Sequence, residues 1–165
     1  MDDDGRASLA VVIPTLGRPS LRAALEALAA QEDAEAFGVV VVHGPEIGEE
    51  QVRALVPAAF PPRLAIIEVS ERSVGARRNA GAAAAPGAWL AFTDDDCRVP
   101  PRWAACLARY CRSHPDVDIA GGAVVEPVRQ SPIYSFMRRI NYMAGPATMK
   151  VRPDGIPSLG AANLL

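Results

Sequence analysis

The chain has 165 residues, half of them hydrophobic and 22% charged, which predicts one globular domain with enough apolar material for a core. A formal net charge of -2 and an aromatic content of 5% argue against a nucleic-acid partner. Three cysteines without a CxxC pair argue against a zinc site and a secreted disulfide framework, so we expect a cytoplasmic protein. No apolar run approaches the roughly 18 residues of a transmembrane helix, and none is expected.

The first eight residues are expected to form a disordered acidic tail. Asp2, Asp3 and Asp4 give this segment negative charge, whereas a secretory signal begins with positive charge. We therefore expect a tail over residues 1–8 and a domain over residues 9–165.

Strand and helix patterns alternate along this domain. Short apolar runs predict buried strands, and apolar residues at three- and four-residue spacing predict amphipathic helices between them. The predicted strands cover residues 9–13, 39–42, 64–69, 89–92 and 118–120. The predicted helices cover residues 20–31, 49–56, 73–85, 102–111 and 133–143. The alternation, with short links, predicts an α/β fold of Rossmann-like type, in which helices flank a mainly parallel sheet.

Polar residues gather where the predicted strands end. Ligands of parallel sheets bind outside the carboxyl ends of the strands. The residues at these ends are Thr15, His43, Gly44, Ser70, Glu71, Asp94, Asp95 and Asp96. The topology therefore places three adjacent aspartates in the expected cleft.

The aspartate triplet indicates a cation site. Asp94, Asp95 and Asp96 repel one another, and a hard divalent cation such as Mg²⁺ or Mn²⁺ removes that cost through oxygen ligands. A solvated acidic turn is the simpler alternative. Glycoside hydrolysis needs two carboxyl groups on either side of a bond, roughly 5 to 9.5 Å apart, and neighbours on one loop cannot straddle a sugar in this way. A metal with a leaving diphosphate fits the triplet better.

A second candidate lies at the start of the helix predicted over residues 73–85, which carries Arg77 and Arg78. Helix N-termini and arginines both favour anionic ligands, although a surface helix with two solvated arginines has the same sequence pattern. The chain contains neither G-x-G-x-x-G nor G-x-x-x-x-G-K-[ST], which argues against a dehydrogenase and a P-loop NTPase.

Four segments, in the same order and approximate spacing, resemble family 2 glycosyltransferases. They are residues 11–15 with Arg18 and Pro19, residues 73–81, residues 88–101 and residues 160–163. The second is similar to the family's "G-x-x-x-A-R-N-x-G" helix, matched at Gly75, Arg78, Asn79 and Gly81. The third resembles the strand that leads into the "DxD" metal motif, and the fourth the "G-A-N" segment at the acceptor side.

The resemblance implies a GT-A fold, a nucleotide-diphosphate sugar donor, a divalent metal (Mg²⁺ or Mn²⁺) and an acceptor that it does not identify. It implies metal contacts from Asp95 and Asp96. The donor-binding residues expected on this basis are Pro14, Thr15, Arg18, His43, Arg78, Asn79, Asp94, Asp95 and Asn163. In this set Thr15 would lie near the base and Asn163 near the transferred sugar. Such enzymes usually invert the anomeric centre, with a carboxylate as general base.

Two features depart from the family pattern. An aspartate that helps to hold the base commonly follows the second strand, where this chain has His43. A neutral imidazole can accept a hydrogen bond through one ring nitrogen, although His43 could equally be an ordinary loop residue. The family's general base normally lies beyond the "G-A-N" segment, so we expect it past Leu165 and expect the domain to be incomplete at its C-terminal acceptor side.

Two alternatives to a glycosyltransferase remain at this point. One is a nucleotide-sugar-binding module that is catalytically incomplete, since no residue of the chain is a convincing base. The other is a nucleotidyltransferase, an enzyme that has a similar sheet and also uses a bound metal ion. It is less favoured, because only one glycine, Gly17, lies in the loop after the first strand.

Overall fold

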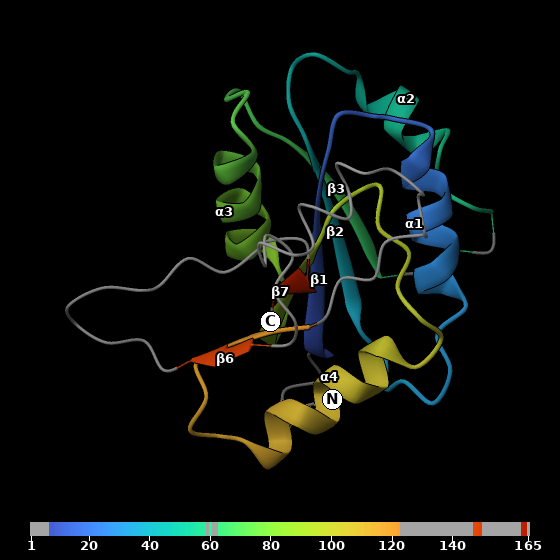
Figure 1. The fold of residues 1–165 in the computed structure, drawn as a ribbon. Helices are drawn as coiled ribbons and strands as arrows, with labels where there is room; N and C mark the ends of the chain where they lie inside the picture. The colour runs from blue at the N-terminus through green and yellow to red at the C-terminus, as the bar shows by residue number, and fades with distance from the viewer. Residues whose placement is uncertain (1–6, 59, 61–62, 123–146, 150–162, 165) are drawn as a thin grey trace, which may run out of the picture.

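Four parallel strands form the centre of the fold in a computed structural model that describes residues 7–58, 60, 63–122, 147–149 and 163–164. They are β1 (Ala7–Thr15), β2 (Gly38–His43), β3 (Leu64–Glu68) and β4 (Gly87–Thr93). Three short strands, β5 (Ile119–Gly121), β6 (Ala147–Met149) and β7 (Asn163–Leu164), extend the sheet in antiparallel pairing. The strand order is β3-β2-β1-β4-β7-β5-β6 (Figure 1).

Helices cover both faces of the parallel strands, which is why these strands read as continuous apolar runs. Successive side chains of a strand point to opposite faces. Val11, Ile13, Val39 and Val41 pack in a cluster with residues of α1 (Ser20–Ala29), α2 (Glu49–Arg53) and α4 (Trp103–Ser113). Val12, Val40 and Val42 face the other way and pack against Ala80 and Ala85, in and just after α3 (Val74–Ala84). Figure 1 shows α3 on the opposite side of the sheet from α1.

Close packing fixes α3 against the sheet. Gly81 lies directly on β1 and β2, so that a Cβ atom there would collide with Val12 and lie 3.0 Å from Cγ2 of Val42. The helix begins after Ser73, whose Oγ accepts a hydrogen bond from the backbone N–H of Ala76 at 3.0 Å. Such an N-cap satisfies one of the free N–H groups of the first turn. The first turns of α3 are thereby held beside the carboxyl edge of the sheet.

The structure confirms the α/β fold with helices on both faces of a parallel sheet, and it moves several boundaries. β1 begins at Ala7, two residues earlier than expected, because Ala7 pairs with Gly87 of β4. α1 and α2 end earlier than expected, at Ala29 and Arg53. The helix predicted over residues 133–143 lies outside the described residues. In the described part of the chain, no helix is long and apolar enough to span a membrane.

Candidate functional site

The ends of β1 and β4 meet at Asp95. The Thr15 hydroxyl donates a hydrogen bond to Oδ2 of Asp95 at 2.7 Å, and the backbone N–H of Leu16 donates to the same oxygen at 3.3 Å. The N–H of Gly17 in turn donates to Oγ1 of Thr15 at 2.9 Å. Asp95 is only 5% exposed, and these charge-assisted hydrogen bonds compensate for its burial. The side chain of Asp95 is therefore held in one orientation at the carboxyl edge of the sheet, beside the end of β1.

The two neighbouring aspartates have different surroundings. Asp94 forms an ion pair with Arg78, whose Nη2 lies 2.7 Å from Oδ1 of Asp94. The side chain of Asp94 is 34% exposed and that of Arg78 is 21% exposed. Asp96 is exposed. Of the three carboxylates, that of Asp94 is paired with an arginine, that of Asp95 is buried and hydrogen-bonded to Thr15 and Leu16, and that of Asp96 is exposed.

The triplet suits a hard cation in its chemistry. Among the described residues, the hydrogen bonds to Asp95 use its Oδ2 and the ion pair of Asp94 uses its Oδ1. All the side-chain atoms of the triplet that could bind a metal ion are oxygens, the ligands that Mg²⁺ and Mn²⁺ prefer. Within the described residues, no three histidine, cysteine, aspartate or glutamate side chains converge as a ready-made metal cage. Mg²⁺ in proteins is often held by only one or two carboxylates, with water among its other ligands, and the triplet fits such a site in its chemistry.

His43 is the last residue of β2 and is fully buried, so it is not a loop residue. It is the register neighbour of Thr15 on β1. Its Nδ1 lies 3.1 Å from the carbonyl oxygen of Gly44, which makes Nδ1 the donor and Nε2 the acceptor of the neutral ring. Nε2 has no hydrogen-bond partner within the part of the chain that the structure describes.

The remaining predicted residues lie around the same edge. Pro14 is buried in β1, and Arg18 and Asn79 are exposed. Asn163 pairs through its backbone with Thr93, directly before the triplet, in the antiparallel β4–β7 ladder. Within the described residues, side-chain hydrogen bonds join two pairs of predicted donor residues, Thr15 with Asp95 and Arg78 with Asp94.

The predicted donor-binding set lacks Arg77, which the sequence places only in the candidate helix segment, and Glu46. Arg77 is 2% exposed, donates from Nη1 to the carbonyl oxygen of Thr15 at 3.1 Å, and forms an ion pair with Glu46. One signal could have identified it. Residues four apart on a helix share a face, and Gly81, four residues after Arg77, is the residue that lets α3 approach the sheet. The arginine that points inward is therefore Arg77, and Arg78 is turned toward the triplet.

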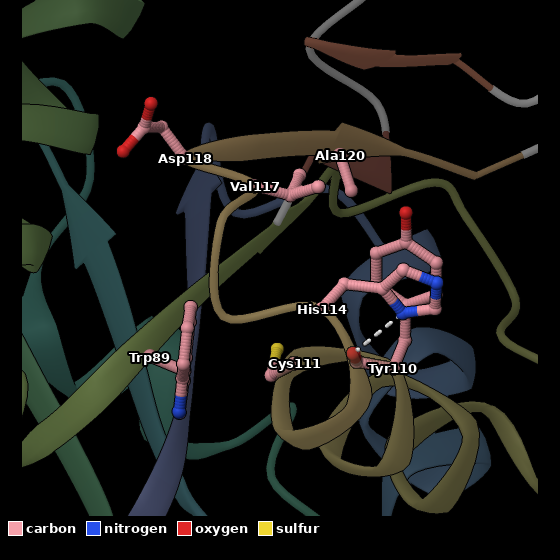
Figure 2. A pocket seen from close by; sticks show the side chains of 7 residues that line it. All are labelled: Trp89, Tyr110, Cys111, His114, Val117, Asp118 and Ala120. Carbon is pink, nitrogen blue, oxygen red and sulfur yellow. Dashed lines mark hydrogen bonds between the residues drawn. The ribbon is translucent and has the colours of Figure 1, made fainter. Parts of the chain in front are cut away.

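Figure 2 shows a hollow elsewhere on the molecule, beside the end of α4. Its volume is about 10 Å³, which is room for about one water molecule. The lining residues are Trp89, Tyr110, Cys111, His114, Val117, Asp118 and Ala120. The rings of Tyr110 and His114 stack at 4.1 Å, and burial raises the pKa of the Cys111 thiol. The hollow contains none of the predicted site residues and is too small for a nucleotide.

The parallel 3-2-1-4 strands with flanking helices define a GT-A-like fold, and solved structures share it. Residues 10–162 match the family model described as "Glycosyl transferase family 2", and the chain belongs to this family. No curated protein matches the sequence.

Two solved glycosyltransferase chains illustrate the similarity. S. aureus TarS 1-349 is 22% identical, with a TM-score of 0.55 over 75% of this chain and 39% of that chain. The mannosyltransferase PcManGT from Pyrobaculum calidifontis, in complex with GDP-Man and Mn²⁺, is 25% identical, with a TM-score of 0.55 over 81% of this chain and 39% of that chain. A further TarS 1-349 structure, in complex with UDP, has a TM-score of 0.54 at 22% identity over 75% of this chain and 38% of that chain. The present chain spans less than two fifths of the length of these chains.

Proposed function

We propose that this chain binds a nucleotide-diphosphate sugar and a divalent cation at the carboxyl edge of β1 and β4, as the donor half of a glycosyltransferase. The observation that carries the proposal is the aspartate triplet at the end of β4, where Asp95 is fixed by Thr15 and Asp94 is paired with Arg78. Family membership supports a sugar nucleotide as the ligand. The complex of PcManGT with GDP-Man and Mn²⁺ supports a cation beside it.

The roles follow from the surroundings of each side chain. Asp96, which is exposed, and the second oxygen of Asp95 are the proposed cation ligands. Asp94 and Arg78 would position the donor, the former by accepting hydrogen bonds from its ribose and the latter by donating to a phosphate oxygen. When bound, the cation would offset the charge that develops on the leaving diphosphate.

The remaining predicted residues complete the proposed donor site. Pro14, Thr15, Arg18 and His43 lie at or after the ends of β1 and β2, where we propose that the base is held. Asn79 lies on α3 beside Arg78, and Asn163 lies next to Thr93 and is proposed to face the transferred sugar. We further propose transfer with inversion of the anomeric centre, with a carboxylate as general base.

Calorimetry with UDP and with GDP, each with and without Mn²⁺, tests the proposal. We expect heat of binding for at least one nucleotide, and a lower Kd when Mn²⁺ is present. Glu26→Gln is a suitable control, because it neutralises an exposed carboxylate of α1 that pairs only locally with Arg22. Equal heats with and without Mn²⁺, or no binding of either nucleotide, would contradict the proposal.

A further inference from the structure

Arg77 is a buried cation at the edge of the sheet that the proposed donor contacts leave unused. Its side chain is 3% exposed, compared with 21% for the neighbouring Arg78. Arginine is rarely buried unless it is paired, so its partners indicate what it does. We propose that Arg77 is a positioning residue, which holds Asp95 in the orientation that binds the cation by fixing Thr15. This inference rests on the function proposed above.

The guanidinium of Arg77 joins the end of β1 to the loop between β2 and α2. Nη1 donates to the backbone carbonyl oxygen of Thr15 at 3.1 Å, and Nη2 pairs with Oε1 of Glu46 in the loop between β2 and α2. Gly44 makes this possible, because a Cβ atom at that position would collide with Nη2 of Arg77 and with the carboxylate of Glu46. The side chain therefore fixes the end of β1 against the loop that follows β2.

The chain of contacts continues from Thr15 to the triplet. The backbone of Thr15 is held by Arg77, and its hydroxyl donates to Oδ2 of Asp95 at 2.7 Å. The N–H of Leu16 donates to the same oxygen, and the N–H of Gly17 donates to the Thr15 hydroxyl. A shift of the Thr15 backbone would thus change every recorded hydrogen bond that orients Asp95.

Stability alone does not account for this arrangement. A buried ion pair contributes little net stability, because the cost of desolvating both charges offsets their attraction. The planar guanidinium instead provides two nitrogens in a fixed geometry, which reach one acceptor at the end of β1 and one in the loop after β2 at once. Lysine would keep the charge and its pairing with Glu46, but it has a single nitrogen and loses the rigid bridge. Arg77→Lys consequently separates charge pairing from positioning.

The first experiment needs no ligand. Amide hydrogen exchange at Leu16 and Gly17 is measured by NMR in the wild-type chain and in Arg77→Lys. Arg53→Met serves as a control, because it removes an arginine from an exposed ion pair of α2 in which Arg77 takes no part. We expect exchange at both amides to be faster by about tenfold in Arg77→Lys and unchanged in Arg53→Met. Unchanged exchange in Arg77→Lys would overturn the inference, whether or not the protein binds a nucleotide.

The second experiment measures the Kd for Mn²⁺ in the presence of UDP or GDP, whichever the wild-type chain binds. We expect Arg77→Lys to weaken Mn²⁺ binding by about 10- to 100-fold, as is typical when a residue that orients a metal ligand is lost. The Kd for the nucleotide without metal should change little. A wild-type Kd for Mn²⁺ in Arg77→Lys would overturn the inference. If the wild-type chain itself shows no metal-dependent binding, the proposed function fails, and the exchange experiment decides about Arg77 separately.

Discussion

At the scale of the residue, three aspartates that are adjacent in sequence have three different environments. Asp94 is paired with Arg78, Asp95 is buried under the Thr15 hydroxyl, and Asp96 is exposed. Removing Asp95 would leave the buried hydroxyl of Thr15 and the N–H of Leu16 without their acceptor, which costs free energy in the folded state. Asp96 is exposed, and it accepts only a long hydrogen bond from the thiol of the adjacent Cys97, at 3.9 Å, within the described residues. It is therefore the position at which cation binding can be tested without disturbing the fold.

Asp96→Ala is expected to abolish the effect of Mn²⁺ on nucleotide affinity while the fold stays intact. The substitution removes a proposed ligand at an exposed position, where the free energy of unfolding usually changes by less than about 0.5 kcal/mol. Calorimetry with and without Mn²⁺ measures the first quantity, and urea unfolding measures the second. A variant that keeps the full Mn²⁺ effect would show that Asp96 does not bind the cation.

His43 provides a second test at this scale. If Nε2 of the buried ring accepts a hydrogen bond from a base N–H, then His43→Ala should weaken nucleotide binding several-fold, since one such bond contributes about 1 kcal/mol. The matched ligand is the same nucleotide methylated at that base nitrogen, which lacks the donor. We expect the wild-type chain to prefer the unmethylated form and the variant to bind both equally well. If His43→Ala weakens the binding of both nucleotides to the same extent, His43 does not accept a hydrogen bond from the base and contributes only to the structure of the sheet.

At the scale of the element, α3 determines how the edge is assembled. Gly81 allows the helix to touch β1 and β2, and this contact turns Arg77 toward the sheet. The sequence pattern predicts the helix but not its rotation, because Arg77 and Arg78 are equivalent in composition and spacing. Rotation depends on which residue of α3 is smallest at the contact. The resemblance to the family motif selects Arg78, and only the packing of α3 in the structure singles out Arg77.

Gly81→Ala is expected to destabilise the fold, whereas Gly75→Ala in the same helix is not. A Cβ at position 81 would collide with Val12, and overpacking of this kind costs about 1 to 3 kcal/mol. That exceeds the gain of about 1 kcal/mol that alanine brings to a helix. At position 75, the nearest atom to a Cβ is Oγ of Ser73 at 3.8 Å, so only the gain applies. Urea unfolding of both variants measures the difference, and equal stabilities would contradict the described packing of α3.

The sequence predicts long, strongly patterned elements well and short ones poorly. The four parallel strands follow from their apolar runs, but β6 and β7 have only three and two residues, too few to show any alternation. After the end of α1, the backbone N–H of Gln31 donates to Leu28, three residues back, while its side-chain Nε2 donates to the carbonyl oxygen of Ala27. The same side chain also bonds to the carbonyl oxygen of Pro100 and the N–H of Ala104. These two partners lie about 70 residues away in sequence and cannot be deduced from local pattern.

At the scale of the whole molecule, the topology gathers distant segments at one edge. β1 lies between β2 and β4, so the loops after all three strands meet, although Thr15 and Asp95 are 80 residues apart in sequence. The antiparallel strand β7 then pairs with the end of β4 and places Asn163 opposite Thr93. The rule that ligands bind at the carboxyl ends of parallel strands predicted this edge from the order of elements alone.

The most direct test of the account is to locate the cation on the chain. Mn²⁺ is paramagnetic and broadens NMR signals of nearby amides, an effect that falls steeply with distance. With Mn²⁺ and a bound nucleotide, we predict strong broadening at Leu16, Gly17, Asp95 and Asp96. The amide of Leu9 lies six residues before the end of β1 and hence roughly 20 Å from that end, so it should be broadened far less. Broadening centred on any other part of the molecule, or none when nucleotide and Mn²⁺ are both present, would contradict a donor site at the carboxyl edge of β1 and β4.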